Sequence, residues 1–126
     1  MRQDRGTLGK LGRLAQLKSD LEMRRFSAFR AHVEASRSRI AVMEERLQAL
    51  YDNPEAFTVA QARLTNAMTV AQVGALDQEK ASLTQILPRF EQARQAAIRE
   101  FGRAEVIRQI GRNQQQEERL EESRRS

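Results

Sequence analysis

Apolar residues recur between Phe26 and Leu50 at alternating spacings of three and four. Seven of the eight positions in this series are apolar, and Arg, Glu and Gln fill most of the positions between them. Two apolar residues per heptad are typical of a coiled-coil seam rather than of the broader face of a globular helix. The pattern predicts a long helix that packs along a narrow stripe. The series is Phe26, Phe29, Val33, Ser36, Ile40, Met43, Leu47 and Leu50.

A second leucine series precedes this seam. Leu14, Leu17 and Leu21 have the same spacing in a different phase, and Leu8 and Leu11 extend them towards the N-terminus. The phase changes by one residue between Leu21 and Phe26. A coiled coil that followed both series would therefore be locally disturbed at that point.

The composition supports long helices and excludes most other folds. The chain has 126 residues, of which 31% are charged and 5% aromatic, with only six Gly and two Pro. A closed β-fold needs frequent turns, and a packed α/β domain needs β-branched and aromatic runs. We therefore expect an all-α fold without a deep catalytic core.

The first helix is predicted to end at Asp52-Asn53-Pro54, because the residue before a proline is disfavoured in the α conformation. The second helix has two possible starts. Asn53 caps it with Pro54 in the first turn, or Thr58 caps it with Gln61 in a capping box. In either case the turn, at about 52–57, is short enough to predict an antiparallel hairpin.

The second helix has a more polar seam that continues to at least Ile110. Pro88 lies inside it and removes one amide donor, so we expect a kink there, with a full break into two helices as the alternative. The expected seam is Val59, Ala62, Asn66, Thr69, Val73, Leu76, Lys80, Leu83, Leu87, Phe90, Arg94, Ala97, Phe101 and Ala104.

The predicted fold is thus a long antiparallel two-helix coiled-coil hairpin with a C-terminal overhang. Residues 1–7 are expected to form a flexible leader, residues 8–111 the hairpin, and residues 112–126 a polar tail that is frayed or disordered. Folding about residues 54–55 pairs residues whose numbers add up to roughly 109. In that register Ile107 and Ile110 have no residue of the first helix opposite them.

The sequence contains no constellation that supports catalysis. It has no Cys and a single histidine, His32, and no Ser has a triad context. Carboxylate pairs such as Glu44-Glu45 lie in solvated helix sequence without a pocket that would shift their pKa values. We therefore expect neither an enzyme nor a bound metal or cofactor.

The positive charge is concentrated at the N-terminal end. Residues 1–30 contain eight Lys or Arg and three Asp or Glu, which equals the net charge of +5 for the whole chain. Such an end attracts nucleic acid, anionic lipid or an acidic protein surface. The longest uncharged run, Leu64–Leu76, is shorter than the roughly 18–20 apolar residues that a membrane span needs.

Two places are predicted to contact partners. The tip of the hairpin collects Leu47, Leu50, Tyr51 and Phe57, although a staple that merely closes the turn explains them equally well. In the overhang, Val106, Ile107 and Ile110 form an apolar stripe among arginines that should dock elsewhere.

Three segments carry a resemblance to a known family. They are LKSDLEMRR (Leu17–Arg25), ERLQALYDNPEAF (Glu45–Phe57) and the Arg-, Gln- and Glu-rich stretch Leu83–Arg119. Together with the basic, Cys-free hairpin they resemble the FliJ/YscO family, the stalk proteins of the flagellar and virulence type III export ATPases. Pro88 and a short tip connection depart from the family pattern.

This resemblance implies a cytoplasmic protein, peripherally associated with the inner-membrane export apparatus. It would couple a hexameric export ATPase to the membrane export gate and escort export chaperones. For the gate, the resemblance implies contacts by Leu47, Leu50, Tyr51 and Phe57. For the ATPase it implies contacts by Arg13, Lys18, Arg24, Arg25, Arg103, Ile107, Arg108 and Ile110.

Two other functions follow from the residues alone. A self-associating coiled-coil adaptor, for instance a dimer of hairpins, fits the heptad pattern equally well. Nucleic-acid binding through the basic end is the third possibility, but the sequence lacks base-stacking aromatics and any recognisable DNA-binding motif.

Overall fold

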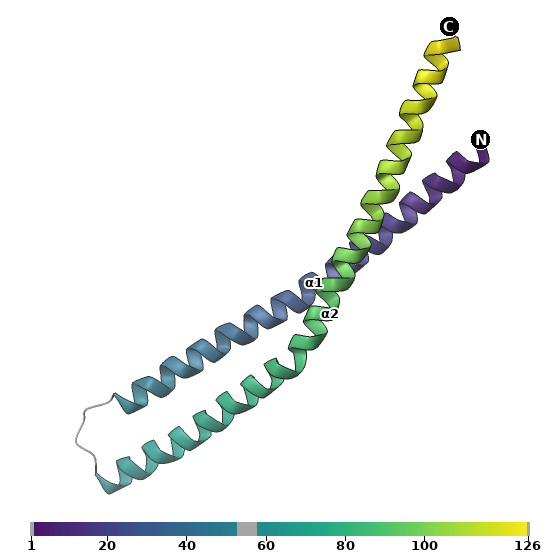
Figure 1. Ribbon diagram of the computed structural model, residues 1–126. Coiled ribbons are helices and arrows are strands. Elements are labelled where there is room, and N and C mark those ends of the chain that lie inside the picture. Colours follow the sequence, from purple (N-terminus) through teal and green to yellow (C-terminus); the bar gives the residue numbers. More distant parts are fainter. Residues whose placement is uncertain (1, 53–57, 126) are drawn as a thin grey trace. The chain divides into compact units, whose positions relative to one another are not determined.

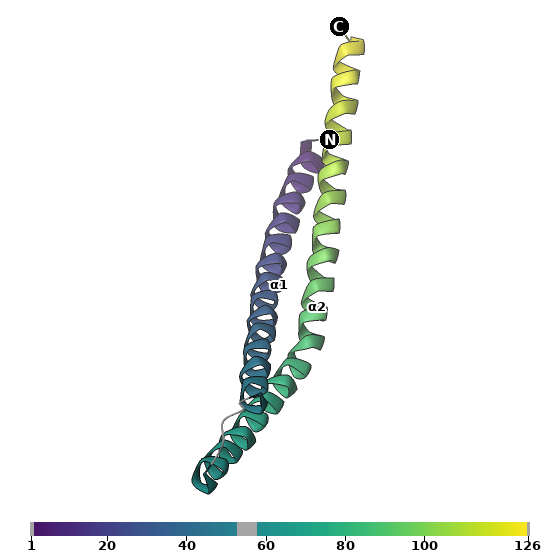
Figure 2. The ribbon, with the colours of Figure 1, turned by 90° about the vertical axis from the view of Figure 1, so that its left-hand side faces the viewer.

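The computed structural model describes residues 2–52 and 58–125, with side-chain packing from residue 6 onward. These residues form two helices, α1 (Arg2–Tyr51) and α2 (Val59–Arg125), and no strand. The helices pack against each other in antiparallel directions (Figures 1 and 2). The predicted all-α two-helix hairpin is therefore confirmed.

The helices contribute to two compact units. The terminal unit consists of Met1–Ala28 and Glu91–Ser126, and the hairpin unit consists of Phe29–Phe90. Each unit has its own narrow core. In the hairpin unit the core includes Val33 and Leu76, whereas in the terminal unit it consists mainly of alanines of α2.

In the hairpin unit, α1 packs as its heptad pattern predicts. Val33 and Ser36 are buried, and the other seam residues between Phe29 and Leu50 are half-buried. On α2 of this unit, the predicted positions Thr69, Leu76, Leu83 and Phe90 are half-buried or buried. The seam positions between them were misplaced by one residue. Gln72, Glu79 and Ile86 face α1, while Lys80 is exposed and Val73 and Leu87 are half-buried beside the seam.

A capping box starts α2. The backbone N–H of Thr58 donates to Oε1 of Gln61 at 3.1 Å, and the backbone N–H of Gln61 donates to Oγ1 of Thr58 at 3.2 Å. The two residues therefore satisfy backbone donors that the first turn of a helix leaves unpaired. This confirms the second of the two predicted starts. The other candidate, Asn53 with Pro54, lies outside the described residues, as does Phe57.

In the terminal unit, most of the described α1 residues that face α2 are small or polar, and Leu8 is the one leucine among them. Apart from Gln16, which is half-buried beside the seam, the half-buried or buried positions of α1 keep one spacing of four and three, ending at Phe26. The predicted change of phase at Leu21–Phe26 is therefore wrong. Small residues on both helices allow close approach, so an undisturbed heptad forms without the leucines. The positions are Leu8, Gly12, Ala15, Ser19, Glu22 and Phe26 on α1, opposite Ala93, Ala97 and Ala104 on α2.

The register between the helices also differs from the prediction. A methyl group placed on Gly12 would lie 3.6 Å from Cγ2 of Ile107, and one on Gly111 would lie 4.0 Å from Cδ2 of Leu8. In both pairs the residue numbers add up to 119 rather than 109. In the hairpin unit, the ion pair between Arg39 and Glu79 gives a sum of 118.

The reason for this shift lies at the start of α2. Folding symmetrically about residues 54–55 would place Val59 beside Leu50, yet Val59 is 72% exposed and residues 58–64 are all exposed. The first turns of α2 therefore have no α1 residue opposite them. Leu50 instead falls in register with Thr69, which is half-buried.

Both terminal segments are helical in the described residues. Helix α1 already begins at Arg2, and α2 continues through Gly111 to Arg125. Gly111 has no left-handed backbone conformation that would end the helix, and Arg, Gln and Glu, which dominate after it, favour helix. Helix α2 also continues through Pro88, so the full break is wrong.

Candidate partner-binding surface

Exposed leucines line α1 in the terminal unit. Leu11, Leu14, Leu17 and Leu21 are 48%, 57%, 67% and 64% exposed. We call these four residues the leucine stripe. The side of α1 that faces α2 carries Gly12, Ala15, Ser19 and Glu22. Three of the leucines, at positions 14, 17 and 21, therefore occupy heptad positions directed away from α2, and Leu11 lies beside the seam. Residues that were predicted to be core are therefore the surface of this unit.

Five basic side chains lie around the leucine stripe. All five are exposed, and within the described part of the chain none of them forms an ion pair. Two acidic residues lie in the same segment: Asp20, which accepts a hydrogen bond from Gln16 at 3.0 Å, and Glu22, which is half-buried in the seam. The surface thus combines apolar side chains with uncompensated positive charge. The five residues are Lys10, Arg13, Lys18, Arg24 and Arg25.

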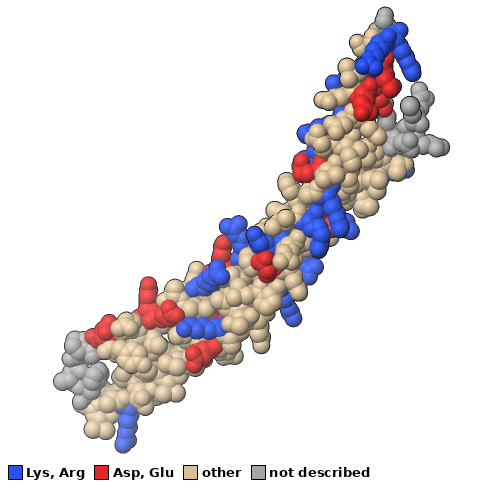
Figure 3. Space-filling view, viewed as in Figure 1, with Lys and Arg blue, Asp and Glu red and all other residues tan. Residues whose placement is uncertain are grey.

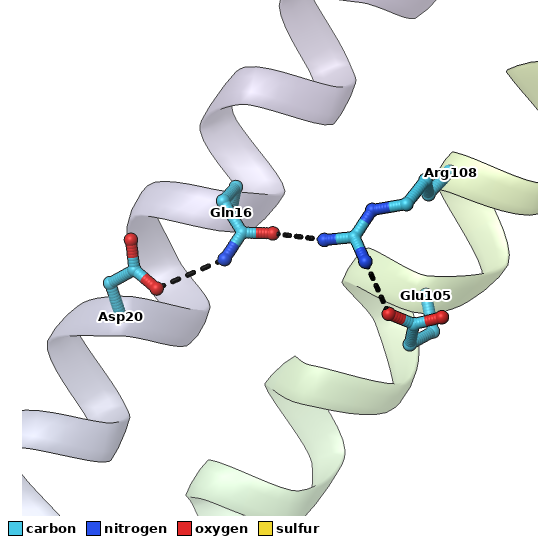
Figure 4. Close-up of polar contacts among 4 residues, drawn as sticks. All are labelled: Gln16, Asp20, Glu105 and Arg108. Atoms are coloured by element: carbon cyan, nitrogen blue, oxygen red, sulfur yellow. Dashed lines mark hydrogen bonds and ion pairs between the residues drawn. The ribbon is translucent and has the colours of Figure 1, made fainter.

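The predicted site residues of α2 are arranged differently. Arg108 donates to Oε1 of Gln16 at 2.6 Å and pairs with Glu105, so it joins the two helices (Figure 4). Arg103 pairs with Glu100 at 2.9 Å. These two arginines are therefore held by groups of the chain itself, unlike the five around the leucine stripe.

The predicted uncovered stripe of the overhang is only partly exposed. Ile107 contacts Gly12 and is half-buried, because the register extends α1 alongside this part of α2. Val106 and Ile110 remain 59% and 44% exposed. The prediction that Ile107 has no counterpart is therefore wrong.

Two hollows lie between the helices of the terminal unit. A hollow of about 690 Å³ is bordered by Gly12, Arg13, Gln16, Ile107 and Arg108, among others. A second hollow of about 330 Å³ is almost entirely apolar. Its lining consists of Met23, Phe26, Arg94, Ala97, Ile98 and Phe101. Sequence reasoning missed it, because Phe101 was assigned to the seam whereas it is 53% exposed at its edge.

The predicted tip contacts do not form one exposed group. Leu47 and Leu50 are half-buried in the seam of the hairpin unit, whereas Tyr51 is 65% exposed. Phe57 lies outside the described residues. Leu64, which sequence reasoning did not single out, is 62% exposed in the first turns of α2.

One polar cluster connects the helices of the hairpin unit. Oε1 of Glu79 accepts hydrogen bonds from the Ser36 hydroxyl at 2.9 Å and from Nε of Arg39 at 3.0 Å. The hydrogen bond from Ser36, followed by that from Arg39, lowers the pKa of the Glu79 carboxyl below its usual value. A further ion pair joins Lys80 and Glu44 at 3.3 Å.

Charge is mixed over the visible surface. On the face drawn in Figure 3, Lys and Arg side chains alternate with Asp and Glu, with no continuous basic track among the residues shown in colour. Nor do the described residues contain a group of three or more His, Asp or Glu side chains arranged to hold a metal ion. Neither α1 nor α2, over the residues described, has a stretch apolar enough to cross a bilayer.

Comparison with known proteins gives no relative for this chain. No protein-family model matches it, and neither the curated proteins nor the solved structures contain a significant match.

Proposed function

We propose that this chain is a non-enzymatic component of a flagellar or type III protein export apparatus. In this role it is the stalk of the export ATPase, couples that ATPase to the membrane export gate and escorts export chaperones. The support is the resemblance of three sequence segments to the FliJ/YscO family, together with a two-helix hairpin of the kind that such a stalk requires.

The observation that carries the proposal is the surface of the terminal unit. Arg13, Lys18, Arg24 and Arg25 are exposed and form no ion pair among the described residues, so their charge is available to a partner. Unpaired cations beside exposed leucines favour binding to an acidic protein surface. We assign the ATPase contact to these four residues and to Ile110.

The structure changes the proposed roles of three other residues. Arg103 and Arg108 already bind carboxylates of α2, and Ile107 packs on Gly12. We therefore propose that Arg108, through Gln16, and Ile107 stabilise the helix pair and that Arg103 stabilises α2 itself. On the gate side, Tyr51 is the exposed candidate, whereas Leu47 and Leu50 belong to the seam.

In this proposal the stalk performs no chemistry. Its two helices present different side chains around the pair, so a ring of ATPase subunits meets a different surface at each position. Preferential binding to one nucleotide state of a subunit would shift the ring towards that state, because a ligand shifts an equilibrium by its difference in affinity.

The test is a titration of the cognate hexameric export ATPase with this protein at low salt. The expected results are binding and faster ATP hydrolysis, both weakened by salt and by the double substitution Lys18→Glu/Arg25→Glu. The control is Arg37→Glu/Arg46→Glu, which makes the same charge change on exposed residues of the hairpin unit. Absence of binding at low salt would contradict the proposal.

The spacing of the leucines, though not the charge around them, favours a second candidate function, a self-associating coiled-coil adaptor. Leu14, Leu17 and Leu21 have seam spacing and are exposed, so two hairpins that packed through them would form a larger helical bundle. Sedimentation distinguishes the two functions. A stable dimer that Leu14→Gln/Leu21→Gln dissociates supports the adaptor, and a monomer that binds the ATPase supports the stalk.

A further inference from the structure

We propose that the leucine stripe is a docking site for one amphipathic helix of a partner protein, with leucine-like side chains on its apolar face and carboxylates beside them. The inference goes beyond the proposed function, because it assigns a surface and a ligand chemistry that hold for any partner that carries such a helix.

The spacing of the stripe fits a helix. Leu14, Leu17 and Leu21 are separated by three and four residues, which is the spacing of side chains that pack into the holes of a neighbouring helix. All three are more than half exposed, and the heptad phase of α1 directs them away from α2. The terminal unit therefore carries a second seam, which faces outward and spans about two helical turns.

The charges around the stripe determine which helix fits. Lys18 and Arg25 occupy one side of the stripe and Arg13 the other, with Lys10 and Arg24 at its ends. The carboxylates of this segment are Asp20 and the half-buried Glu22, so the cations outnumber them five to two. Glu or Asp residues next to the apolar face of the partner helix would oppose these cations. Carboxylates in such flanking positions set the choice and orientation of coiled-coil partners.

The same charges disfavour two other occupants. A second copy that packed through its own leucine stripe would bring five cations towards five cations, and like charges oppose association. A membrane surface would attract the cations, but interfacial helices insert a broad apolar face that commonly contains Trp or Phe, and this stripe is narrow and consists of leucine only.

The experiment uses the whole protein and a synthetic helical peptide of about three heptads. The peptide has leucine at its seam positions and Glu at the flanking positions. A control peptide of the same length has Lys in place of every Glu. Binding is measured by fluorescence anisotropy at low and high salt.

The acidic peptide is expected to bind, with an affinity that falls as salt rises. Leu14→Gln/Leu21→Gln and Lys18→Glu/Arg25→Glu are each expected to weaken binding about tenfold or more. Leu64→Gln changes an equally exposed leucine of the hairpin unit and is expected to leave the affinity unchanged. Circular dichroism of each variant checks that the helix pair is intact.

Several results would overturn the proposal. They are failure of the acidic peptide to bind, equal binding of the Lys peptide, and an equal loss in Leu64→Gln. If the peptide does not bind, two other results would reassign the stripe, provided that Leu14→Gln/Leu21→Gln abolishes them. Binding to vesicles that contain phosphatidylserine would assign the stripe to lipid. A dimer in sedimentation would assign it to self-association. Because no export ATPase is used, these outcomes are independent of the proposed function.

Discussion

The hydroxyl of Ser36 on α1 donates a 2.9 Å hydrogen bond to the carboxylate of Glu79 on α2. Arg39 binds the same oxygen, with Nη2 at 2.9 Å. Ser36 is a buried polar residue, whereas the other α1 residues of the seam in this unit are apolar. A shift of one heptad would place Phe29 or Met43, in place of Ser36, beside this carboxylate. We infer that the cluster selects the register of this unit.

Acidification is expected to remove the contribution of this cluster to stability. The pKa of Glu79 is lower in the folded protein than in the unfolded chain, so its stabilising effect is present above the unfolded pKa of about 4.3. The effect is lost as the pH falls through the lowered, folded pKa. Thermal melts of the wild type and of Glu79→Gln should differ at neutral pH and converge in acid. A constant difference at every pH would refute this assignment.

Val33 is expected to be the most sensitive apolar position of the hairpin unit. It is 2% exposed, so Val33→Ala removes buried methyl groups and leaves a cavity, at a cost of about 2 kcal/mol in the free energy of unfolding. Val70→Ala is the matched control, since Val70 is 65% exposed, and it should change stability by less than about 0.5 kcal/mol. Urea titration measures both. Equal effects would mean that Val33 does not lie in the seam.

Gly12 is expected to tolerate alanine but not leucine. A β-carbon there would lie 3.6 Å from Ile107, an ordinary contact, so Gly12→Ala should gain about 0.5–1 kcal/mol from helix propensity. Gly12→Leu should lose about 1–3 kcal/mol through overpacking. Gly74, whose added β-carbon would have no neighbour within 4 Å, should accept both substitutions. Thermal unfolding of the four variants tests this, and a stabilising Gly12→Leu would contradict the close helix contact.

The capping box at the start of α2 should stabilise its first turn. Thr58→Ala removes the acceptor for the backbone N–H of Gln61 and is expected to cost about 1 kcal/mol. Thr58→Ser retains the acceptor and serves as the control. Amide hydrogen exchange near residues 59–63 should accelerate in the alanine variant alone. Equal exchange in both variants would show that the cap does not hold the helix end.

The sequence was sufficient to predict the fold class and the α1 seam from Phe26 to Leu50, and it offered the capping box at Thr58 as one of two possible helix starts. These features depend on local rules, namely heptad spacing and helix-end chemistry, and local residues determine them. The same rules located one of the two seam positions in each heptad of α2 from Thr69 onward, as at Leu76 and Leu83.

Features that depend on pairing between the helices were not predictable in this way. Leu14 and Leu21 were expected in the seam because they are apolar, yet the small residues Gly12 and Ala15 fill it. A small residue favours the seam only where the opposite helix can approach closely. The spacing of residues along one helix does not show which part of the other helix lies opposite. The register failed for a related reason, since a symmetrical turn was assumed and the first turns of α2 have no α1 residue opposite them.

The error in the predicted register changed which residues form the candidate site. In the predicted register, in which paired residue numbers add up to 109, Ile107 belongs to the exposed apolar group. In the observed register, in which they add up to 119, Ile107 lies beside Gly12. The leucines of α1 then become the exposed apolar group. The proposed partner-binding surface therefore depends on the register of the terminal unit.

Cross-linking tests this register directly, because the chain contains no cysteine that would react elsewhere. Two double variants are compared, Ala15→Cys/Ala104→Cys and Ala15→Cys/Arg94→Cys, whose residue numbers match the sums of 119 and 109. Each is treated with a short thiol cross-linker, and the fraction of intramolecularly linked monomer is measured by mass spectrometry. The structure predicts rapid linking of Ala15→Cys to Ala104→Cys and little linking to Arg94→Cys. The reverse preference would contradict the register and, with it, the exposure of the leucine stripe.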